Sequence, residues 1–141
     1  MDFLTSFKIC GDALASQRAR MDVVASNLAN ASTTKTPEGG PYRRKVVSLS
    51  SKEVTGSFDD ALKESIRSVK VENIREDKQG FRKVYDPSHP DADDKGVVML
   101  PNVEPIVEMA ELIAVNRSFE ATVTAFDAAK NMALKTLEIG K

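Results

Sequence analysis

The only histidine of the chain, His89, stands beside a hydroxyl side chain in a proline-flanked loop. Ser88 precedes it and Asp86 lies two residues further back, so one short stretch holds the residue types of a nucleophile, a base and an orienting acid. Neighbours in a tight loop do not by themselves make a nucleophile and base pair, and the carboxylate is a generic one. We therefore interpret His89 as a turn residue and keep a hydrolase only as an alternative.

Residue types that bind metals or phosphates lack the required spacing. The acidic stretch 91–96 begins like an EF-hand calcium loop, but Lys95 stands at the fifth position and Asn102 at the twelfth, where a bidentate glutamate is needed. The Gly39-Gly40 pair lacks the lysine of a phosphate-binding loop. We predict no catalytic residue, no metal site and no cofactor.

Charge and composition narrow the function classes further. Lys plus Arg (20) balances Asp plus Glu (21), which removes the broad electrostatic argument for nucleic acid or an anionic membrane. The one basic cluster, residues 43–45, has no aromatic platform beside it, and we interpret it as a solvated or partner-facing strand end. Cys10 has no second cysteine to bridge and is interpreted as a small buried residue. No apolar run is long enough to span a membrane, and Asp2 and Lys8 argue against a cleavable signal peptide.

The first thirty residues predict a long amphipathic helix. Its apolar row alternates gaps of four and three, the spacing of a helix that packs along another helix, and Gln17 is its only strongly polar member. At 1.5 Å per residue the helix is roughly 40 Å long and needs a partner of similar length. The row consists of Phe3, Phe7, Cys10, Leu14, Gln17, Met21, Val24 and Leu28.

A second long helix is predicted from Pro105 to the region of Gly140. Glu104, Glu108 and Glu111 are interpreted as its solvated, dipole-complementing start. Its row again steps by three and four, with polar residues at two positions. The row consists of Met109, Leu112, Asn116, Phe119, Val123, Phe126, Lys130, Ala133 and Leu137.

Between the helices the sequence predicts a small β-rich unit. Strands are expected at 42–50, 66–74, 81–85 and 97–100, with a hairpin joining 66–74 to 81–85 and a short helix near 58–63. The expected fold class is α+β: long N- and C-terminal helices paired as an antiparallel coiled coil, with the β-rich domain inserted between them. The expected boundaries are 1–34, 35–101 and 102–141.

Two helices bury one stripe each, so apolar and amide side chains remain for other partners. Asn27, Asn30 and Asn116 add polar groups that must find hydrogen bonds if assembly buries them. The predicted assembly interface consists of Phe3, Phe7, Cys10, Leu14, Gln17, Met21, Val24, Asn27, Leu28, Asn30, Met109, Leu112, Asn116, Phe119, Val123, Phe126, Ala133 and Leu137.

Four stretches carry a family resemblance. Residues 15–34 (ASQRARMDVVASNLANASTT) resemble the N-terminal signature of bacterial flagellar rod and hook axial proteins. Within that family, 36–44 (TPEGGPYRR), 84–93 (VYDPSHPDAD) and 135–140 (KTLEIG) resemble the proximal rod proteins. The resemblance spans nearly the whole chain.

The resemblance implies a structural protein rather than an enzyme. Such subunits are exported unfolded by the flagellar type III export apparatus without a cleaved signal, and they polymerise in the periplasm into the rod. Terminal helices of many copies form the inner tube and export channel, and the central unit faces outward. The implied partners are further copies, other rod proteins, the MS-ring and its rod adaptor, with no nucleic acid and no membrane-embedded part. A cytoplasmic coiled-coil adaptor or scaffold protein is the alternative function.

The helices are expected to depend on packing for their stability. Isolated helices are marginal in water, so we expect the termini to be largely disordered in the free monomer and to fold on assembly.

Overall fold

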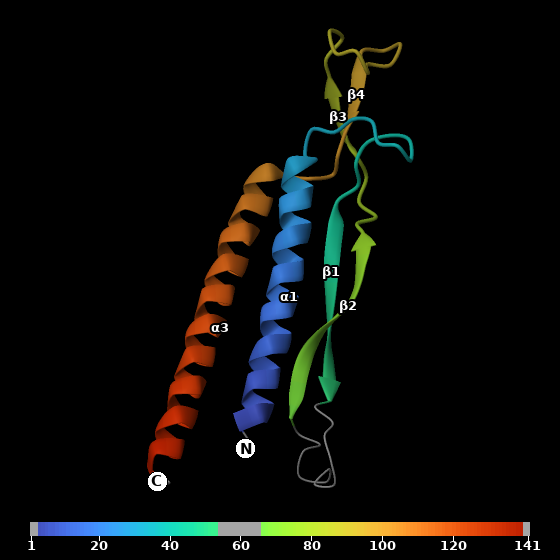
Figure 1. Ribbon diagram of the computed structural model, residues 1–141. Coiled ribbons are helices and arrows are strands. Elements are labelled where there is room, and N and C mark those ends of the chain that lie inside the picture. Colours follow the sequence, from blue (N-terminus) through green and yellow to red (C-terminus); the bar gives the residue numbers. More distant parts are fainter. Residues whose placement is uncertain (1–2, 54–65, 140–141) are drawn as a thin grey trace.

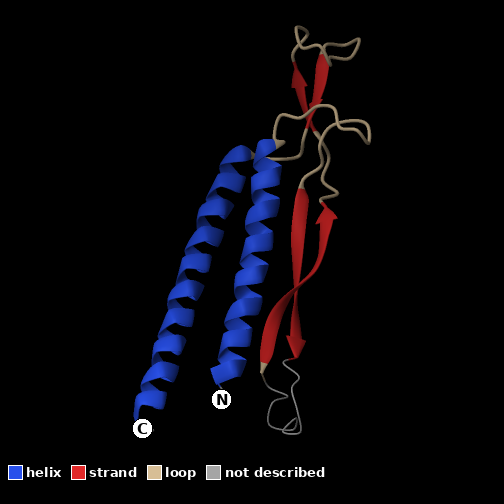
Figure 2. Ribbon diagram, viewed as in Figure 1, coloured by secondary structure: helices blue, strands red, loops and turns tan. Residues whose placement is uncertain are grey.

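The computed structural model describes residues 3–53 and 66–139. Its elements are α1 (Phe3–Ala29), β1 (Lys45–Glu53), β2 (Arg67–Glu76), β3 (Arg82–Tyr85), β4 (Val97–Leu100) and α3 (Pro105–Ile139) (Figures 1 and 2). Long helices at both ends with strands between them confirm the predicted α+β class. The helix expected near 58–63 lies outside the described residues.

α1 is the middle layer of the molecule. Figure 1 shows α3 on one side of it, running antiparallel, and the β1–β2 ribbon on the other, and α1 contacts all three of these elements. The rings of Phe7 and Phe126 lie 5.2 Å apart toward one end of the helix pair. Arg20 and Glu111 form an ion pair nearer the other end. The predicted partner of similar length for the first helix is therefore the second.

The end of α1 is fixed by its own polar side chains. The Asn30 amide donates to the carbonyl of Ser26 at 2.9 Å, and the Thr33 hydroxyl donates to Asn30 Oδ1 at 3.2 Å. The Ser26 carbonyl also accepts the backbone amide of Asn30, so the carboxamide reinforces this turn, and Thr33 holds the carboxamide in place. The backbone amide of Tyr42 then donates to the carbonyl of Thr33, which directs the chain toward β1.

The strands form two separate antiparallel ribbons, β1 with β2 and β3 with β4. The predicted hairpin between 66–74 and 81–85 is therefore wrong. β1 offers β2 a partner of nearly its full length, from Lys45 opposite Glu76 to Glu53 opposite Arg67. After β2, Arg43 donates to the carbonyls of Asp77 and Gln79, and the chain continues into β3, which pairs with β4.

The hydrophobic core is thin and concentrated near the C-terminal end of α1. Val23, Val24, Val103 and Val115 are its most buried aliphatic members on or beside the helices. Two-stranded ribbons are marginal alone, so each depends on neighbouring segments. Among the described residues no helix is apolar enough over sufficient length to cross a membrane.

Candidate assembly surface and its polar junction

The Asn27 side chain, 1% exposed, lies at the centre of a buried polar junction between the helices and β1. Its Nδ2 donates to the carbonyl of Lys45 at 2.9 Å and to Glu108 Oε2 at 3.0 Å. Its Oδ1 accepts from the Tyr42 hydroxyl at 3.0 Å and from the backbone amide of Lys45 at 2.9 Å. All four hydrogen-bonding positions of the carboxamide are filled, so its orientation is fixed.

The Asn27 side chain also makes the hydrogen bonds that a neighbouring strand would make at the outer edge of β1. The amide of Asp77 donates to the carbonyl of Arg44 across the β1–β2 ribbon, so the polar groups of the next residue, Lys45, point to the outer edge. There the Asn27 carboxamide pairs with both of them. This contact fastens α1 to the beginning of the ribbon in one register.

Glu108 brings α3 into the same junction. Its side chain is fully buried, and Oε1 accepts from Arg44 Nε at 2.6 Å. Arg44 in turn lies 3.5 Å from Asp77 Oδ2, and its backbone amide donates to Asn102 Oδ1 at 2.8 Å. Burial opposes the charge on Arg44, but the hydrogen bond and charge of Glu108 outweigh it and raise the pKa of the guanidinium.

The solvated role expected for the glutamates at the start of α3 is wrong for Glu108. A carboxylate enters a core when donors satisfy both oxygens, and here Asn27 and Arg44 do so. The basic cluster 43–45 is correspondingly more than a solvated strand end, because Arg44 faces inward. Sequence reasoning placed Tyr42 and Arg44 in the expected strand 42–50 and gave neither a part in a buried contact, because no local pattern marks one.

Burial of Glu108 sets which side of α3 faces α1. Apart from Glu111, which pairs with Arg20, the buried and half-buried positions of α3 alternate by four and three in a continuous seam. They are Glu108, Leu112, Val115, Phe119, Thr122, Phe126, Ala129 and Ala133. Four predicted interface residues lie in this seam, namely Leu112, Phe119, Phe126 and Ala133.

The other four predicted interface residues of α3 lie outside the seam. Met109 is 53% exposed, Val123 36% and Leu137 71%, and Asn116 is exposed with its amide donating to Glu120. Met109 and Val123 each follow a seam position by one residue, and Leu137 lies one turn beyond the last seam position. The structure therefore divides the predicted set between an intrachain seam and a free surface.

On α1 the predicted residues are covered more evenly, because that helix has neighbours on two sides. Val24 and Asn27 are buried, and Phe3 is exposed. Gln17 Oε1 is buried without a hydrogen-bond partner among the described residues. The half-buried members are Phe7, Cys10, Leu14, Gln17, Met21, Leu28 and Asn30.

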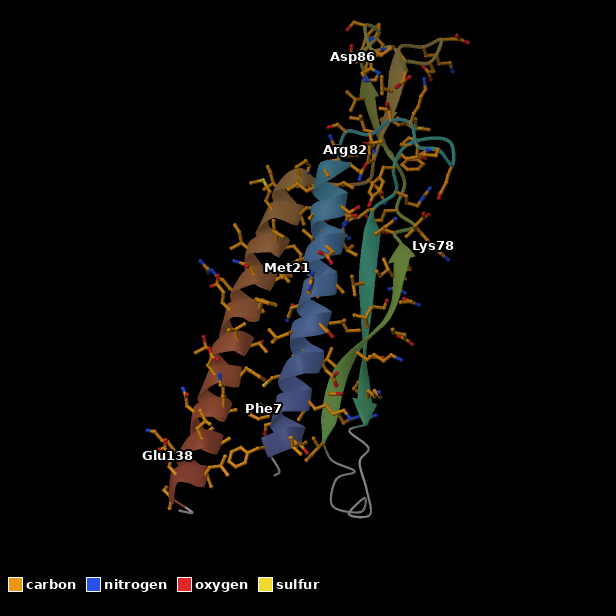
Figure 3. All side chains as sticks on the ribbon, in the orientation of Figure 1. Phe7, Met21, Lys78, Arg82, Asp86 and Glu138 are labelled. Carbon is orange, nitrogen blue, oxygen red and sulfur yellow. The ribbon has the colours of Figure 1, made fainter. Side chains whose placement is uncertain are left out.

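An open cleft of about 460 Å³ runs beside the helix pair. Met21 contributes to it from α1, and Leu112, Ile113 and Asn116 contribute from α3. Ile113 is 56% exposed, and Ile106 on the same helix is 77% exposed. Figure 3 shows side chains projecting from the outer side of α3 along its whole length, as far as Glu138. Exposed isoleucine side chains beside an open cleft are typical of a protein–protein contact.

The His89 loop lies at the far tip of the molecule, where Figure 3 labels Asp86. The Ser88 hydroxyl donates to Asp86 Oδ1 at 2.6 Å, and His89 Nδ1 accepts the backbone amide of Asp91. These bonds are those of a turn, as predicted for His89. No group of three potential metal-ligating side chains occurs within 3–53 and 66–139.

Asp91 ties this loop to the segment after α1. Its Oδ2 accepts from the Thr34 hydroxyl at 2.6 Å, and its Oδ1 pairs with Lys35. The hydrogen bond from Lys35, followed by that from Thr34, lowers the pKa of the Asp91 carboxyl.

Comparison with known proteins identifies relatives over the full chain. Residues 9–35 match the family model "Flagella basal body rod protein", and 95–139 match "Flagellar basal body rod FlgEFG protein C-terminal". The flagellar basal-body rod protein FlgC of Bacillus subtilis is 48% identical, covering 96% of this chain and 97% of the relative. FlgC of Salmonella typhimurium is 38% identical, covering 100% of both chains.

The polar junction predicts that substitutions which keep the shape of a side chain but change its hydrogen bonding lower the stability of the fold. In Asn27→Asp an oxygen would face the carbonyl of Lys45 and Glu108, and in Glu108→Gln an amide would face a donor. We expect each to lower the free energy of unfolding by about 3 kcal/mol. Denaturant unfolding of the full chain measures this, with exposed Glu104→Gln as the matched control. Equal stability of Glu108→Gln and Glu104→Gln would contradict the junction.

The Asp91 contact predicts resistance to acid. When folding lowers the pKa of a carboxyl, its ionised form stabilises the folded state. This stabilisation is fully present above the unfolded-state pKa of about 4, and it is lost as the pH falls through the folded-state pKa. We therefore expect the Thr34–Asp91 contact to persist to below about pH 4. An NMR titration of the Thr34 and Asp91 amides checks this, with Asp91→Asn as the control. Release of the loop already near pH 5 would contradict the lowered pKa.

Proposed function

The chain belongs to the FlgC family of flagellar basal-body rod proteins and is a structural subunit of the rod, and on this premise we propose that it polymerises through its terminal helices. The main support for this proposal is that half of the predicted interface residues on α3 stay exposed in the single chain. Met109 and Val123 leave apolar surface on α3 that the chain's own fold does not cover. Neighbouring helices of the rod would cover it.

The proposal includes the packing mode of the helix pair. The seam on α3 has the alternating spacing of a coiled coil, and the contact of Phe7 with Phe126 supports interdigitating side chains. We propose an antiparallel coiled coil of 1–34 with 102–141 as the inner part of the subunit. The β-rich domain 35–101 would then form the outer part.

The proposed assembly is the axial drive shaft of the motor and the wall of the export channel. Assembly with other rod components follows from the family. The proposed specific neighbours are further copies of the chain, proximal and distal rod proteins, the MS-ring and its adaptor protein. The subunit works in the flagellar basal body, and we propose that it reaches the periplasm through the type III export apparatus without a cleaved signal. It would act mechanically and not as an enzyme.

Folding of the helices is proposed to depend partly on assembly. The polar junction holds one end of the helix pair within each chain, where Asn27 meets Glu108. At the other end Leu4 is 73% exposed and Leu137 71%. We propose that this end becomes fully stable only within the assembly, since apolar burial is what stabilises most helices in proteins.

A charge on the exposed row tests this proposal. Val123→Asp should leave the monomer folded, because the side chain already contacts water, but should block incorporation by placing an unpaired charge in the contact. Motility on soft agar and the amount of chain in purified basal bodies measure the effect. We expect at least a tenfold loss of incorporated chain, about 1.4 kcal/mol or more.

Ala121→Asp is the matched control, because Ala121 is exposed two residues away on the other side of the same helix. Normal motility of Val123→Asp with unchanged folding would contradict the proposed contact. Loss of monomer folding in this variant would instead place Val123 in the intrachain core, against its exposure.

A further inference from the structure

We infer that the exposed side of α1 in one copy packs antiparallel against the exposed side of α3 in a second copy, through two complementary rows of side chains. The inference rests on the proposed polymerisation and names its contact. It uses surfaces separate from the intrachain seam. Each row follows the spacing of four and three that keeps side chains on one stripe of a helix.

Glycine or alanine occupies half of the positions in the row on α1. It runs along the side that neither α3 nor the β1–β2 ribbon covers, and all its members are exposed. Its eight members are Leu4, Lys8, Gly11, Ala15, Arg18, Asp22, Ala25 and Ala29. Small side chains let a second helix approach closely, but by themselves they do not say which helix.

The row on α3 is made mainly of large residues. It lies beside the intrachain seam, borders the cleft that Ile113 and Asn116 line, and is also exposed throughout. Its eight members are Met109, Ile113, Asn116, Glu120, Val123, Asp127, Lys130 and Leu134. The two rows have the same number of positions and the same order of gaps when one is read backward, as antiparallel packing requires.

Superposing the rows in that direction gives size complementarity. Ala29 falls opposite Met109 and Ala25 opposite Ile113, so at these levels a large apolar side chain meets a small one. Ala15 falls opposite Val123 in the same way. At the outer end two leucines, Leu4 and Leu134, face each other, and these are 73% and 50% exposed in the single chain.

The charges agree with this alignment at its centre. Arg18 falls opposite Glu120, and Asp22 lies within one residue of Arg117. Lys8 falls opposite Lys130, but Asp127 lies one turn from Lys130 and is within reach of both ammonium groups. One like-charge position with a shared carboxylate is tolerable at a solvated rim.

The alignment is distinct from the intrachain one. Within the chain Arg20 pairs with Glu111 and Phe7 with Phe126. Facing Arg18 with Glu120 instead shifts the second copy by about five to seven residues, or roughly 7 to 11 Å at 1.5 Å per residue. Each copy offers one row of each kind, so the contact is heterologous and can repeat from copy to copy as a filament requires.

Disulfide cross-linking in assembled basal bodies tests the contact. On a Cys10→Ser background, one tagged chain carries Ala15→Cys and a second carries Val123→Cys, so any disulfide joins two chains. We expect a mixed dimer after mild oxidation, since cysteines at facing positions fall within the Cα distance of about 4.4–6.8 Å that a disulfide allows. The control replaces Val123→Cys by Ala121→Cys, an equally exposed position on the other side of the helix, and should lose the dimer.

Charge reversal gives a second readout without cysteines. Arg18→Glu or Glu120→Arg alone should reduce the chain in basal bodies, and the double variant should restore it. No mixed dimer, or equal dimer with Ala121→Cys, in basal bodies that contain the chain would overturn the inference and leave the proposed polymerisation standing. Absence of the unsubstituted chain from basal bodies would overturn both.

Discussion

The hydrogen bond between the buried amide of Asn27 and the buried carboxylate of Glu108 is the contact on which the fold depends. It joins the last turn of α1 to the first turn of α3, and the remaining positions of Asn27 hold the start of β1. Buried polar groups are stable only when every partner is present. The two helices and the ribbon must therefore come together at this point in one geometry.

The junction also determines which surface stays free. Turning Glu108 inward places Val115 and Ala129 against α1 and turns Met109 and Val123 outward. Since α1 already lies between α3 and the ribbon, none of the elements within residues 3–53 and 66–139 covers that outer row (Figure 2). The proposed polymerisation follows from this difference between the two sides of α3. The apolar side chains of the outer row can be buried only by contact with another subunit.

Sequence patterns predicted both long helices and the strands closely, because amphipathic period and proline or glycine boundaries are local signals. They failed for strand pairing, since the choice between β1 and β3 as the partner of β2 depends on long-range contacts. The sequence patterns also predicted, wrongly, that Met109 and not Glu108 would face α1. A buried glutamate becomes favourable only when Arg44 and Asn27, distant in sequence, meet it, and no local pattern carries that information.

Amide hydrogen exchange on the dilute full chain tests the central claim most directly. The junction predicts strong protection where α1 and α3 meet it, at residues 23–28 and 108–115, and weak protection at the opposite ends, at residues 3–7 and 133–139. In assembled rods the protection should become even along both helices. Uniform strong protection of α1 in the monomer, or equally weak protection at both of its ends, would contradict the account.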